Sequence, residues 1–526
     1  MPHPALRDYL EDIDMWEDAI NELNERRGRI LTGNAERIAK QHASGKMTAR
    51  ERLDVLFDEG TFIEVNDFVE SRAVDFGMER KRTAGDGVVT GYGKINGRTV
   101  FASSQDFTVN GGSLGETHAK RICRIMDMAY DMRVPYVSIN DSGGARIEEG
   151  IDALNGYGEI FARNTRASGV IPQISVIMGP CAGGACYSAA LCDFIFMVYE
   201  KSFMFITGPT VIKTVTQEEV TTEVLGGAKM HSETSGVAHF AYEDDASCLQ
   251  DVRRLLSYLP QNTDDRPPRM SGVQVDDCRR LTEIVPDNRK RGYDVKEVIF
   301  SMIDDGSFME VQPEYAKNAA VGFARLNSEV IGVVANQPIY LGGTLDCNAS
   351  DKIARFVRFC DCFHIPLLTF VDVPAFLPGT AQEFNGIIRH GAKILFAYSE
   401  ARVPKVTVIL RKAYGGAYIA MCSKGLGADF VYAWPIAEIA VMGAEGAVNI
   451  VAKKTIQAAP DPEAERKAQI EEYERQFLNP YIAASHGYID QVILPEETRT
   501  KVVAAFEMLK SKNVPCASKR HGNIPL

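Results

Sequence analysis

Two pairs of adjacent glycines are the residues of this sequence best suited to chemistry. Gly183-Gly184 lies in CAGGACYS and Gly415-Gly416 lies in AYGGAYIA, each after an apolar run and before a stretch of small residues. Glycine lets backbone N–H groups approach a ligand that a side chain would block. If a helix begins at each pair, its first amides have no partner within the helix and can stabilise an oxyanion. The pattern therefore predicts two sites that polarise a carbonyl oxygen.

Other interpretations of the glycine pairs are available. The glycines could serve only the close packing of a helix on a strand, which is the commoner reason for an isolated pair. Their occurrence at equivalent places in two halves of the chain favours a ligand site instead. A phosphate-binding loop is excluded, because neither pair is followed by the Gly-Lys-Ser/Thr sequence of that motif.

Side chains that could attack a substrate or transfer a proton are less convincing. Cys181 and Cys186 flank the first pair, but no histidine partner is evident and small buried thiols are common. Glu148, Glu149 and Glu159 could act as acid/base carboxylates, although carboxylates on a helix are more often solvated or ion-paired. The sequence thus favours a reaction whose base arrives with a substrate.

Two further charged features have ordinary interpretations. His390 lies in a helical stretch, where a structural histidine is the default expectation. The run Arg80-Lys81-Arg82 could bind the phosphates of a CoA-type ligand, but it could equally form a solvated turn.

The elements that must position the glycine pairs occur twice in the chain. The two halves share residues of the same type, in the same order and at nearly constant spacing, which indicates two copies of one fold. The matches are Gly111-Gly112 with Gly342-Gly343, Pro135 with Pro366, Asp141 with Asp372, Pro172 with Pro404, and the two glycine pairs with each other.

Each copy alternates short apolar runs with helical stretches. VPYVSIN, PQISVIMG, IPLLTFV and PKVTVILR are bounded by Pro or Gly, which predicts buried strands. Apolar residues recur at three- and four-residue spacing in residues 150–168 and 385–401, which predicts helices. This alternation predicts an α/β fold.

Two domains are expected, because 526 residues exceed what one core usually holds. The polar, Pro-rich stretch at residues 258–277 predicts the connection between them. We expect domains at residues 1–260 and 291–526, with a linker at 261–290. Amphipathic helices are expected within residues 13–57, with Thr48 as an N-cap.

Composition narrows the class of protein. A net charge of −12 argues against a nucleic-acid surface, which needs a basic face. The 11 cysteines form no CxxC pairs, which favours reduced thiols and no metal site. The start of the sequence does not read as a signal peptide and no apolar run is long enough for a membrane helix, so we expect a cytoplasmic protein.

Several long motifs resemble one known family. DSGGARIEEGIDALNGYGEIF, GPCAGGACYS, GIIRHGAKILFAYSEARVPKVTVILRKAYGGAYIAM and YAWPIAEIAVMGAEGAVNI are similar to the carboxyltransferase subunits of biotin-dependent acyl-CoA enzymes. The resemblance is greatest to the propionyl-CoA carboxylase β and methylmalonyl-CoA decarboxylase α branch. It extends from KQHASGKMTARERL to the terminal HGNIPL.

The resemblance implies two tandem crotonase-like domains, each a ββα superhelix, that arose by internal duplication. It also implies that acyl-CoA binds mainly to the N-terminal domain and biotin to the C-terminal domain. In this family the active site lies between subunits of a homohexamer.

Site residues follow from the same resemblance, position by position. Gly183 and Gly184 would hold the enolate oxygen of the thioester. Gly416 and Ala417, with Gly415, would hold the ureido oxygen of biotin. The remaining residues implied to contact the substrate are Gly143, Gly144, Ala145, Tyr157 and Ile419.

Three positions depart from the family pattern. Ile419 replaces the aspartate of many propionyl-CoA carboxylases, whereas decarboxylases and transcarboxylases have an aliphatic residue there. The acyl preference therefore stays open among acetyl, propionyl and methylmalonyl groups. Ala375 and Gln217 stand where relatives usually have glycine, and the sequence assigns no consequence to either.

Missing motifs define the expected partners. The chain has no biotin-attachment motif and no glycine-rich ATP site. Biotin must then come from a biotin carboxyl carrier protein that works with a biotin carboxylase subunit, or with membrane subunits in a decarboxylase.

The expected function is carboxyl transfer from biotin to propionyl-CoA, which forms methylmalonyl-CoA. A methylmalonyl-CoA decarboxylase or a transcarboxylase would run the same step in reverse. More distant alternatives are a crotonase-type hydratase or isomerase that uses Glu148 or Glu159, and a non-catalytic scaffold.

Overall fold

The chain divides into two compact units in a computed structural model that describes residues 4–270, 281–515 and 520–526. The first unit comprises Met1–Met230 with Ala241–Arg253, and the second comprises His231–Phe240 with Arg254–Leu526. The short segment groups with the second unit because Gln312 donates hydrogen bonds to the carbonyls of His239 (3.0 Å) and Gly236 (2.5 Å). The domain limits at residues 260 and 291 stay a prediction. Of the expected linker, residues 271–280 lie outside the described residues.

Each unit contains one mixed eight-stranded sheet, and the two sheets have the same strand order. The first sheet runs β1-β2-β3-β4-β5-β6-β8 with β7 on β5, and the second runs β9-β10-β11-β12-β13-β14-β16 with β15 on β13. The strands of the first sheet are β1 (Ile63–Glu64), β2 (Val88–Ile95), β3 (Arg98–Gln105), β4 (Tyr136–Ser142), β5 (Gln173–Ala182), β6 (Phe194–Val198), β7 (Phe203–Phe205) and β8 (Phe240–Tyr242). Those of the second are β9 (Met309–Val311), β10 (Ala319–Leu326), β11 (Glu329–Asn336), β12 (Leu367–Val373), β13 (Lys405–Tyr414), β14 (Phe430–Ala433), β15 (Glu438–Ala440) and β16 (Gln491–Val492).

The predicted strands and the duplicated α/β fold are confirmed. In each sheet two antiparallel pairs lead into parallel strands, from β3 to β6 and from β11 to β14. The parallel strands are almost continuously buried, which agrees with their uninterrupted apolar sequences.

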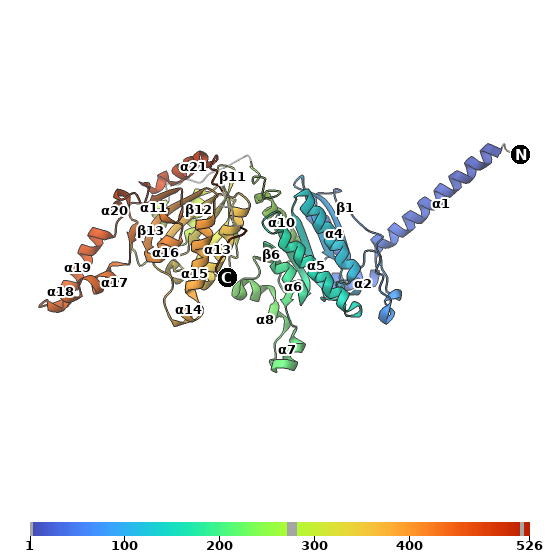
Figure 1. The fold of residues 1–526 in the computed structure, drawn as a ribbon, viewed down its shortest axis with the longest axis horizontal. Helices are drawn as coiled ribbons and strands as arrows, with labels where there is room; N and C mark the ends of the chain where they lie inside the picture. The colour runs from blue at the N-terminus through green and yellow to red at the C-terminus, as the bar shows by residue number, and fades with distance from the viewer. Residues whose placement is uncertain (1–3, 271–280, 516–519) are drawn as a thin grey trace. The chain divides into compact units, whose positions relative to one another are not determined.

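Helices connect the parallel strands and cover the sheets. α4 and α5 pack side by side in the first unit, as do α13 and α15 in the second (Figure 1). The helices of the first unit are α1 (Pro4–Thr32), α2 (Ala35–Ala43), α3 (Ala49–Leu56), α4 (Glu116–Met132), α5 (Ile151–Ala167), α6 (Gly184–Ala190), α7 (Pro209–Thr216), α8 (Thr222–Gly226), α9 (Ala228–Met230) and α10 (Asp245–Tyr258), whose last residues belong to the second unit. Those of the second are α11 (Leu281–Ile284), α12 (Val295–Met302), α13 (Cys347–Cys362), α14 (Thr380–Phe384), α15 (Ile387–Glu400), α16 (Gly415–Ala420), α17 (Ala444–Val451), α18 (Lys453–Ala458), α19 (Pro462–Phe477), α20 (Pro480–Ser485) and α21 (Thr498–Leu509).

Local signals explain where several helices begin. Thr48 and Glu51 form a complete capping box at the start of α3, as the sequence predicts. Asp346 caps α13 through its side chain, and Asp294 caps α12 in the same way.

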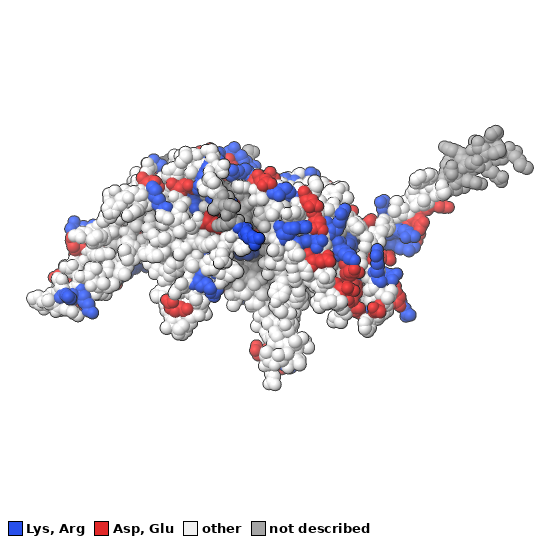
Figure 2. All heavy atoms as spheres, in the orientation of Figure 1, with Lys and Arg blue, Asp and Glu red and all other residues white. Residues whose placement is uncertain are grey.

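Charged side chains of both signs are interspersed on the face drawn in Figure 2, where they form no continuous basic surface. None of the nine cysteines that lie among the described residues forms a disulfide bond, and eight of them are buried. Their reduced state in the cell stays a prediction.

Candidate active site

β5 runs directly into α6 at the first glycine pair. Gly183 is the N-cap residue with φ 61° and ψ −125°, a conformation that residues with a side chain rarely adopt. Its N–H donates to the carbonyl of Phe205 at 3.0 Å, so this amide is already engaged. Gly184 begins α6, and nothing among the described residues accepts a hydrogen bond from its N–H. The pair thus presents one unpaired amide at the carboxyl end of β5.

The neighbouring strand β4 ends level with β5 and supplies a second loop. Ser142 of β4 and Cys181 of β5 are register partners. Ala145 and Gly184 each lie three residues beyond this pair. The two loops therefore leave the sheet at the same level. Parallel strands therefore bring the two segments that the sequence separates by a whole helix to one edge of the sheet.

The loop after β4 is held so that the amide of Ala145 remains unpaired. Leu114 N donates to the carbonyl of Gly144, and Arg146 N donates to the carbonyl of Leu114, each at 2.9 Å. The Ala145 N–H between them has no acceptor within the described ranges. A Cβ on Gly144 would lie 3.3 Å from the carbonyl oxygen of Ala182, so this loop contacts the strand that leads into the glycine pair. Two such amides from adjacent loops are suited to one oxyanion.

The second unit repeats this arrangement with the same register. Val373 of β12 pairs with Ala413 of β13, and Phe376 and Gly416 each lie three residues beyond that pair. Gly415 has φ 56° and occupies the position of Gly183 in the first unit.

Phe376 is a further candidate for the site, and the sequence did not indicate it. Leu345 N donates to the carbonyl of Ala375 at 3.1 Å and Leu377 N donates to the carbonyl of Leu345 at 2.8 Å, as at the equivalent loop of the first unit. The amide of Phe376 is thereby left unpaired among the described residues. The duplication could have found it, since Phe376 matches Ala145 at the spacing that relates Asp372 to Asp141.

Tyr157 of α5 packs against Gly184. A Cβ on Gly184 would lie 3.1 Å from Cγ of this ring, closer than ordinary van der Waals contact. The Tyr157 hydroxyl is buried next to Ser142 without a hydrogen bond of good geometry, and burial raises its pKa. A Cβ on Gly416 would meet nothing within 4 Å. The first unit therefore encloses Gly184 more tightly than the second unit encloses Gly416.

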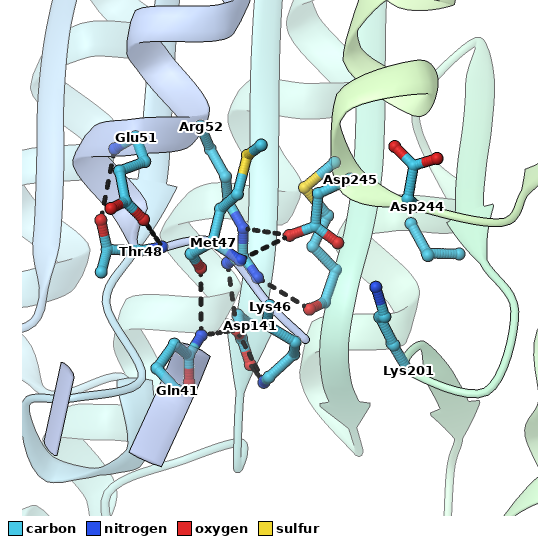
Figure 3. Close-up of polar contacts among 12 residues, drawn as sticks. Gln41, Lys46, Met47, Thr48, Glu51, Arg52, Asp141, Lys201, Asp244 and Asp245 are labelled. Atoms are coloured by element: carbon cyan, nitrogen blue, oxygen red, sulfur yellow. Dashed lines mark hydrogen bonds and ion pairs between the residues drawn. The ribbon is translucent and has the colours of Figure 1, made fainter. Parts of the chain in front are cut away.

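Buried charges fix the end of β4 just before the loop (Figure 3). The carboxylate of Asp141 accepts hydrogen bonds from Lys46 Nζ, Arg52 Nη1 and Gln41 Nε2, each at 3.0 Å. Asp141 and Arg52 are fully buried, and Lys46 and Gln41 are less than 10% exposed. The three donors come from the α2–α3 region, so the N-terminal helices hold the strand that carries the Ala145 loop.

Arg52 extends this cluster to two further elements. Its Nη2 donates to the carbonyl of Met178 on β5 at 3.0 Å, and its Nε donates to Asp245 on α10 at 3.1 Å (Figure 3). The backbone N–H of Met47 donates to the same Asp245 oxygen at 3.1 Å. One guanidinium therefore joins β4, β5 and α10.

Glu149, one of the alternative acid/base candidates, is committed to structure. Its carboxylate accepts from Arg146 Nη1 at 2.7 Å and from Glu116 N at 2.7 Å, and its side chain is 6% exposed. Arg146 also donates to Asp86 at 2.8 Å. Burial raises the pKa of Asp86, although the charge of Arg146 opposes that shift.

The other two carboxylates of the alternative mechanism lie at the surface. Glu148 is 3.9 Å from Lys81, and Glu159 is 3.7 Å from Arg163. Both side chains are more than one-third exposed. They lack the buried setting that tunes a general base.

The second unit anchors its glycine pair with different residues. Asp372 is fully buried and accepts from Arg411 Nε at 3.1 Å and from Lys412 N at 3.1 Å. Tyr414, which precedes Gly415, donates its hydroxyl to Glu438 on β15.

The remaining sequence candidates have structural partners. Cys186 Sγ donates to the carbonyl of Cys181 at 2.8 Å. A hydrogen bond from Cys181, which itself has a raised pKa, lowers the pKa of Cys186. The thiols therefore partner one another rather than a histidine. His390 Nδ1 forms a partly buried hydrogen bond with the carboxylate of Asp351 at 2.9 Å.

The basic run Arg80-Lys81-Arg82 lines a cavity of about 990 Å³ in the first unit. Arg37 and Asn110 line it too, and they also line a second cavity of about 630 Å³ that contains Lys46 and Gly111. The run that the sequence singled out therefore lines a cavity of mixed charge, which is also lined by the carboxylates of Glu22, Glu25, Glu64, Glu70 and Asp106.

The three residues that depart from the family pattern have different surroundings in the structure. Ile419 lies on α16 and is 42% exposed. Gln217 has φ 63°, a left-handed conformation that glycine adopts at less cost. Nothing in the structure explains Ala375, whose carbonyl accepts the hydrogen bond described above.

No described helix is both long and apolar enough to cross a membrane. Within the same residues, no group of three or more His, Cys, Asp or Glu side chains is arranged to hold a metal ion.

Comparisons with known proteins identify the family. Residues 40–524 match the carboxyl transferase domain. The propionyl-CoA carboxylase carboxyltransferase subunit of Haloferax mediterranei is 58% identical over 97% of this chain and 99% of its own length. The methylmalonyl-CoA decarboxylase subunit alpha of Propionigenium modestum is 57% identical over 96% and 99%.

A solved structure agrees with the sequence relatives. The transcarboxylase 12S hexamer with bound methylmalonyl-coenzyme A superposes with a TM-score of 0.94 at 53% identity, over 96% of this chain and 98% of that one. The fold is therefore the crotonase-like carboxyltransferase fold with two domains. On these grounds the chain belongs to the carboxyl transferase domain family and is a carboxyltransferase.

Proposed function

We propose that this carboxyltransferase moves a carboxyl group between biotin on a partner protein and a short acyl-CoA, with propionyl-CoA and methylmalonyl-CoA as the pair. The two relatives are a propionyl-CoA carboxylase subunit and a methylmalonyl-CoA decarboxylase subunit, and the similar hexamer binds methylmalonyl-coenzyme A. Relatives of both names are almost equally similar, at 58% and 57% identity. Similarity therefore supports the carboxyl-transfer step and not its direction, which the partner subunits decide. We assign the carboxylase direction because carboxylase assemblies are the commoner setting, with the decarboxylase or transcarboxylase as the alternative.

One observation carries the proposal: in each unit two amides, of Gly184 and Ala145 or of Gly416 and Phe376, have no acceptor among the described residues and lie at the same register beyond two parallel strands. A crotonase-type hydratase needs one such site, and its carboxylate catalyst is not supported by the ion-paired Glu148, Glu149 and Glu159. Two sites suit a reaction in which two carbonyl oxygens gain negative charge.

In the first unit, the amides of Gly184 and Ala145 would hold the thioester oxygen of the acyl-CoA as it becomes an enolate. Gly183 would contribute the turn, since its own N–H is bonded to Phe205. Gly143 and Gly144 would let the loop approach the substrate closely, and the ring of Tyr157 would pack against Gly184. Each donor is worth about 2.7–4 kcal/mol in comparable oxyanion sites.

In the second unit, the amides of Gly416 and Phe376 would hold the ureido oxygen of biotin, with Gly415 and Ala417 forming the turn. Biotin, when bound, carries the carboxyl group on a ring nitrogen. The open space around Gly416 supports this assignment, because a bicyclic ring needs room beside the amide. Ile419, exposed on the same helix, would line the acyl end of the site.

The cations that line the two cavities of the first unit are proposed to bind the phosphates of CoA. Arg80, Lys81 and Arg82 line one cavity, Lys40 and Lys201 line the other, and Arg37 lines both. Several cations around a hollow suit a multiply charged ligand.

The proposed assembly is a homohexamer in the cytoplasm, by analogy with the transcarboxylase hexamer. Biotin would arrive on a biotin carboxyl carrier protein charged by a biotin carboxylase subunit. Membrane decarboxylase subunits would replace these partners if the step ran in reverse.

The test uses the purified full chain with free biotin and methylmalonyl-CoA, with propionyl-CoA followed by mass spectrometry and malonyl-CoA run in parallel. Biotin-dependent formation of propionyl-CoA is the expected result. Turnover of malonyl-CoA alone would move the assignment to an acetyl-CoA enzyme. No turnover of either compound by an intact oligomer would refute carboxyl transfer.

A further inference from the structure

We infer that Asp141 is a positioning residue, which acts through the Ala145 amide and is itself held by the N-terminal helices α2 and α3. The inference rests on the proposed function, in that it takes the Ala145 amide as an oxyanion donor. It assigns a role in catalysis to a buried aspartate that would not touch the substrate.

Asp141 occupies a space that permits little movement. Its carboxylate fills the position where a Cβ on Gly179 would lie, and its carbonyl oxygen fills the position where a Cβ on Gly112 would lie. Its N–H donates to Gln105 Oε1 at 3.2 Å. Backbone and side chain of this residue are therefore both fixed by close neighbours.

The segment from Asp141 to Ala145 has little slack that could absorb a displacement. Gly144 N donates to Ser142 Oγ at 3.1 Å, and Gly143 N donates to a neighbouring loop carbonyl at 3.0 Å. The amides of Asp141, Gly143 and Gly144 each donate a hydrogen bond. The Ala145 amide has no acceptor among the described residues. A shift of Asp141 is thus transmitted to the first unpaired donor along the loop.

The buried cluster around Asp141 contains equal numbers of positive and negative charges, and the Asp141 carboxylate is needed for this balance. Lys46 and Arg52 supply two cations, while Asp141 and Asp245 supply two carboxylates. Removing the charge of Asp141 leaves the cations of Lys46 and Arg52 beside a neutral side chain in a buried setting, where like charges repel strongly. The end of β4 must then relax.

The second unit offers a natural comparison. Asp372 has the same place in the fold and the same burial, but its arginine partner Arg411 comes from the adjacent strand β13. Only the first unit uses donors from α2 and α3. The N-terminal helices, which precede the duplicated fold, therefore support the strand that carries the Ala145 loop of the first unit.

The experiment compares two ligands on the intact oligomer. One is propionyl-CoA, and the other is a CoA thioether that carries a nitronate where the enolate would form. A site shaped for the enolate binds the nitronate more tightly than the substrate. Asp141→Asn is expected to weaken nitronate binding by about tenfold or more while the Kd of propionyl-CoA changes by less than about twofold. A merely structural role would change both affinities together or neither.

Asp372→Asn is the matched control, since it makes the same change at the equivalent position of the other unit. It is expected to leave the ratio of the two affinities within about twofold of the wild-type value. Arg52→Lys is the second variant, in case Asp141→Asn does not fold. Lysine retains the charge but cannot reach Asp141, Asp245 and Met178 at once. Arg52→Lys is therefore expected to weaken nitronate binding relative to propionyl-CoA binding, as Asp141→Asn does.

The outcomes separate the inference from the proposed function. If the wild-type protein does not prefer the nitronate, the oxyanion site itself is refuted. If the wild type prefers it and both Asp141→Asn and Arg52→Lys keep the wild-type ratio, Asp141 has no positioning role. An equal loss of ratio in Asp372→Asn would also overturn the inference.

Discussion

Substitution of Gly184 by alanine tests the oxyanion site of the first unit most directly. The new methyl group would lie 3.1 Å from Cγ and 3.2 Å from Cδ2 of Tyr157. Carbon atoms in ordinary contact are about 3.5–4.0 Å apart, so either the ring or the Gly184 backbone must move by a few tenths of an ångström. Since the ring is buried, the unpaired amide of Gly184 is expected to shift.

The expected loss of activity follows from the value of one donor. Complete removal of an oxyanion-hole donor costs about 2.7–4 kcal/mol. A displaced donor that keeps about half of this value would lower kcat roughly 10- to 30-fold. Overpacking costs about 1–3 kcal/mol in stability, but alanine is preferred over glycine in a helix by up to about 1 kcal/mol, so the fold should survive.

The assay is the biotin-dependent turnover of methylmalonyl-CoA, together with thermal unfolding of each variant. Gly158→Ala is the matched control, because Gly158 adjoins Tyr157 on α5 and a Cβ there meets nothing within 4 Å. This control should keep the wild-type kcat and unfold at the same or a slightly higher temperature.

A double variant shows whether the contact with Tyr157 is the cause. Tyr157→Leu shortens the side chain beneath Gly184 and should recover part of the kcat that Gly184→Ala loses. The reasoning is refuted if Gly184→Ala turns over at the wild-type rate. It is also refuted if the losses of the two single variants simply add in the double variant, because residues in contact should couple.

Three further predictions concern stability. Burial, with the nearby charge of Arg146, lowers the pKa of His118 to about 3 from 6.5, so the unfolded chain binds a proton that the folded chain refuses between these values. The free energy of unfolding should therefore fall by about 1.4 kcal/mol for each pH unit below pH 6.5. Urea unfolding of the wild type and His118→Gln at pH 7 and pH 5 measures this. An equal loss of unfolding free energy in both proteins would contradict the prediction. Lys352 donates to the carbonyls of Gln312, Tyr315 and Ala319, each at 2.8 Å. Lys352→Met should thus cost about 3 kcal/mol by chemical unfolding, whereas Lys317→Met, in a half-exposed pair, should cost less than about 1 kcal/mol. Thr48→Ala removes the capping box of α3 and should cost about 1 kcal/mol, which Thr48→Ser should largely restore.

Much of the fold could be predicted because it depends on patterns within short stretches. The apolar runs that became β4, β5, β12 and β13 are buried on both faces, and a buried strand has an uninterrupted apolar sequence whatever its neighbours are. Thr48 and Glu51 form a capping box that requires only a spacing of three residues. The duplication was visible because glycines, prolines and aspartates at turns changed least between the copies.

The site was predicted less completely, since its geometry depends on residues far apart in the sequence. Nothing near Gly183 indicates that its amide is bonded to Phe205, a partner on a later strand. Phe376 has an apolar side chain, which gives no sign that its backbone N–H is the relevant group. Arg52 stands in ARERLDVLF, where a charged residue on a short helix is expected to face water, yet it is fully buried. Periodicity indicates which face of a helix is buried but not which partner it meets.

The three-way contact of Arg52 has a consequence for the order in which the chain can fold. Its guanidinium meets Asp141, 89 residues later, and Asp245, 193 residues later. At a synthesis rate of about 5–20 residues per second, α3 waits roughly 10–40 s before α10 has been made. Until then Asp245 is missing from the ion cluster of the first unit. Arg52 and Asp141, which are buried in the folded unit, stay in contact with water. The first unit should therefore close late, and the glycine pair at its edge should acquire its geometry only after the whole unit has left the ribosome.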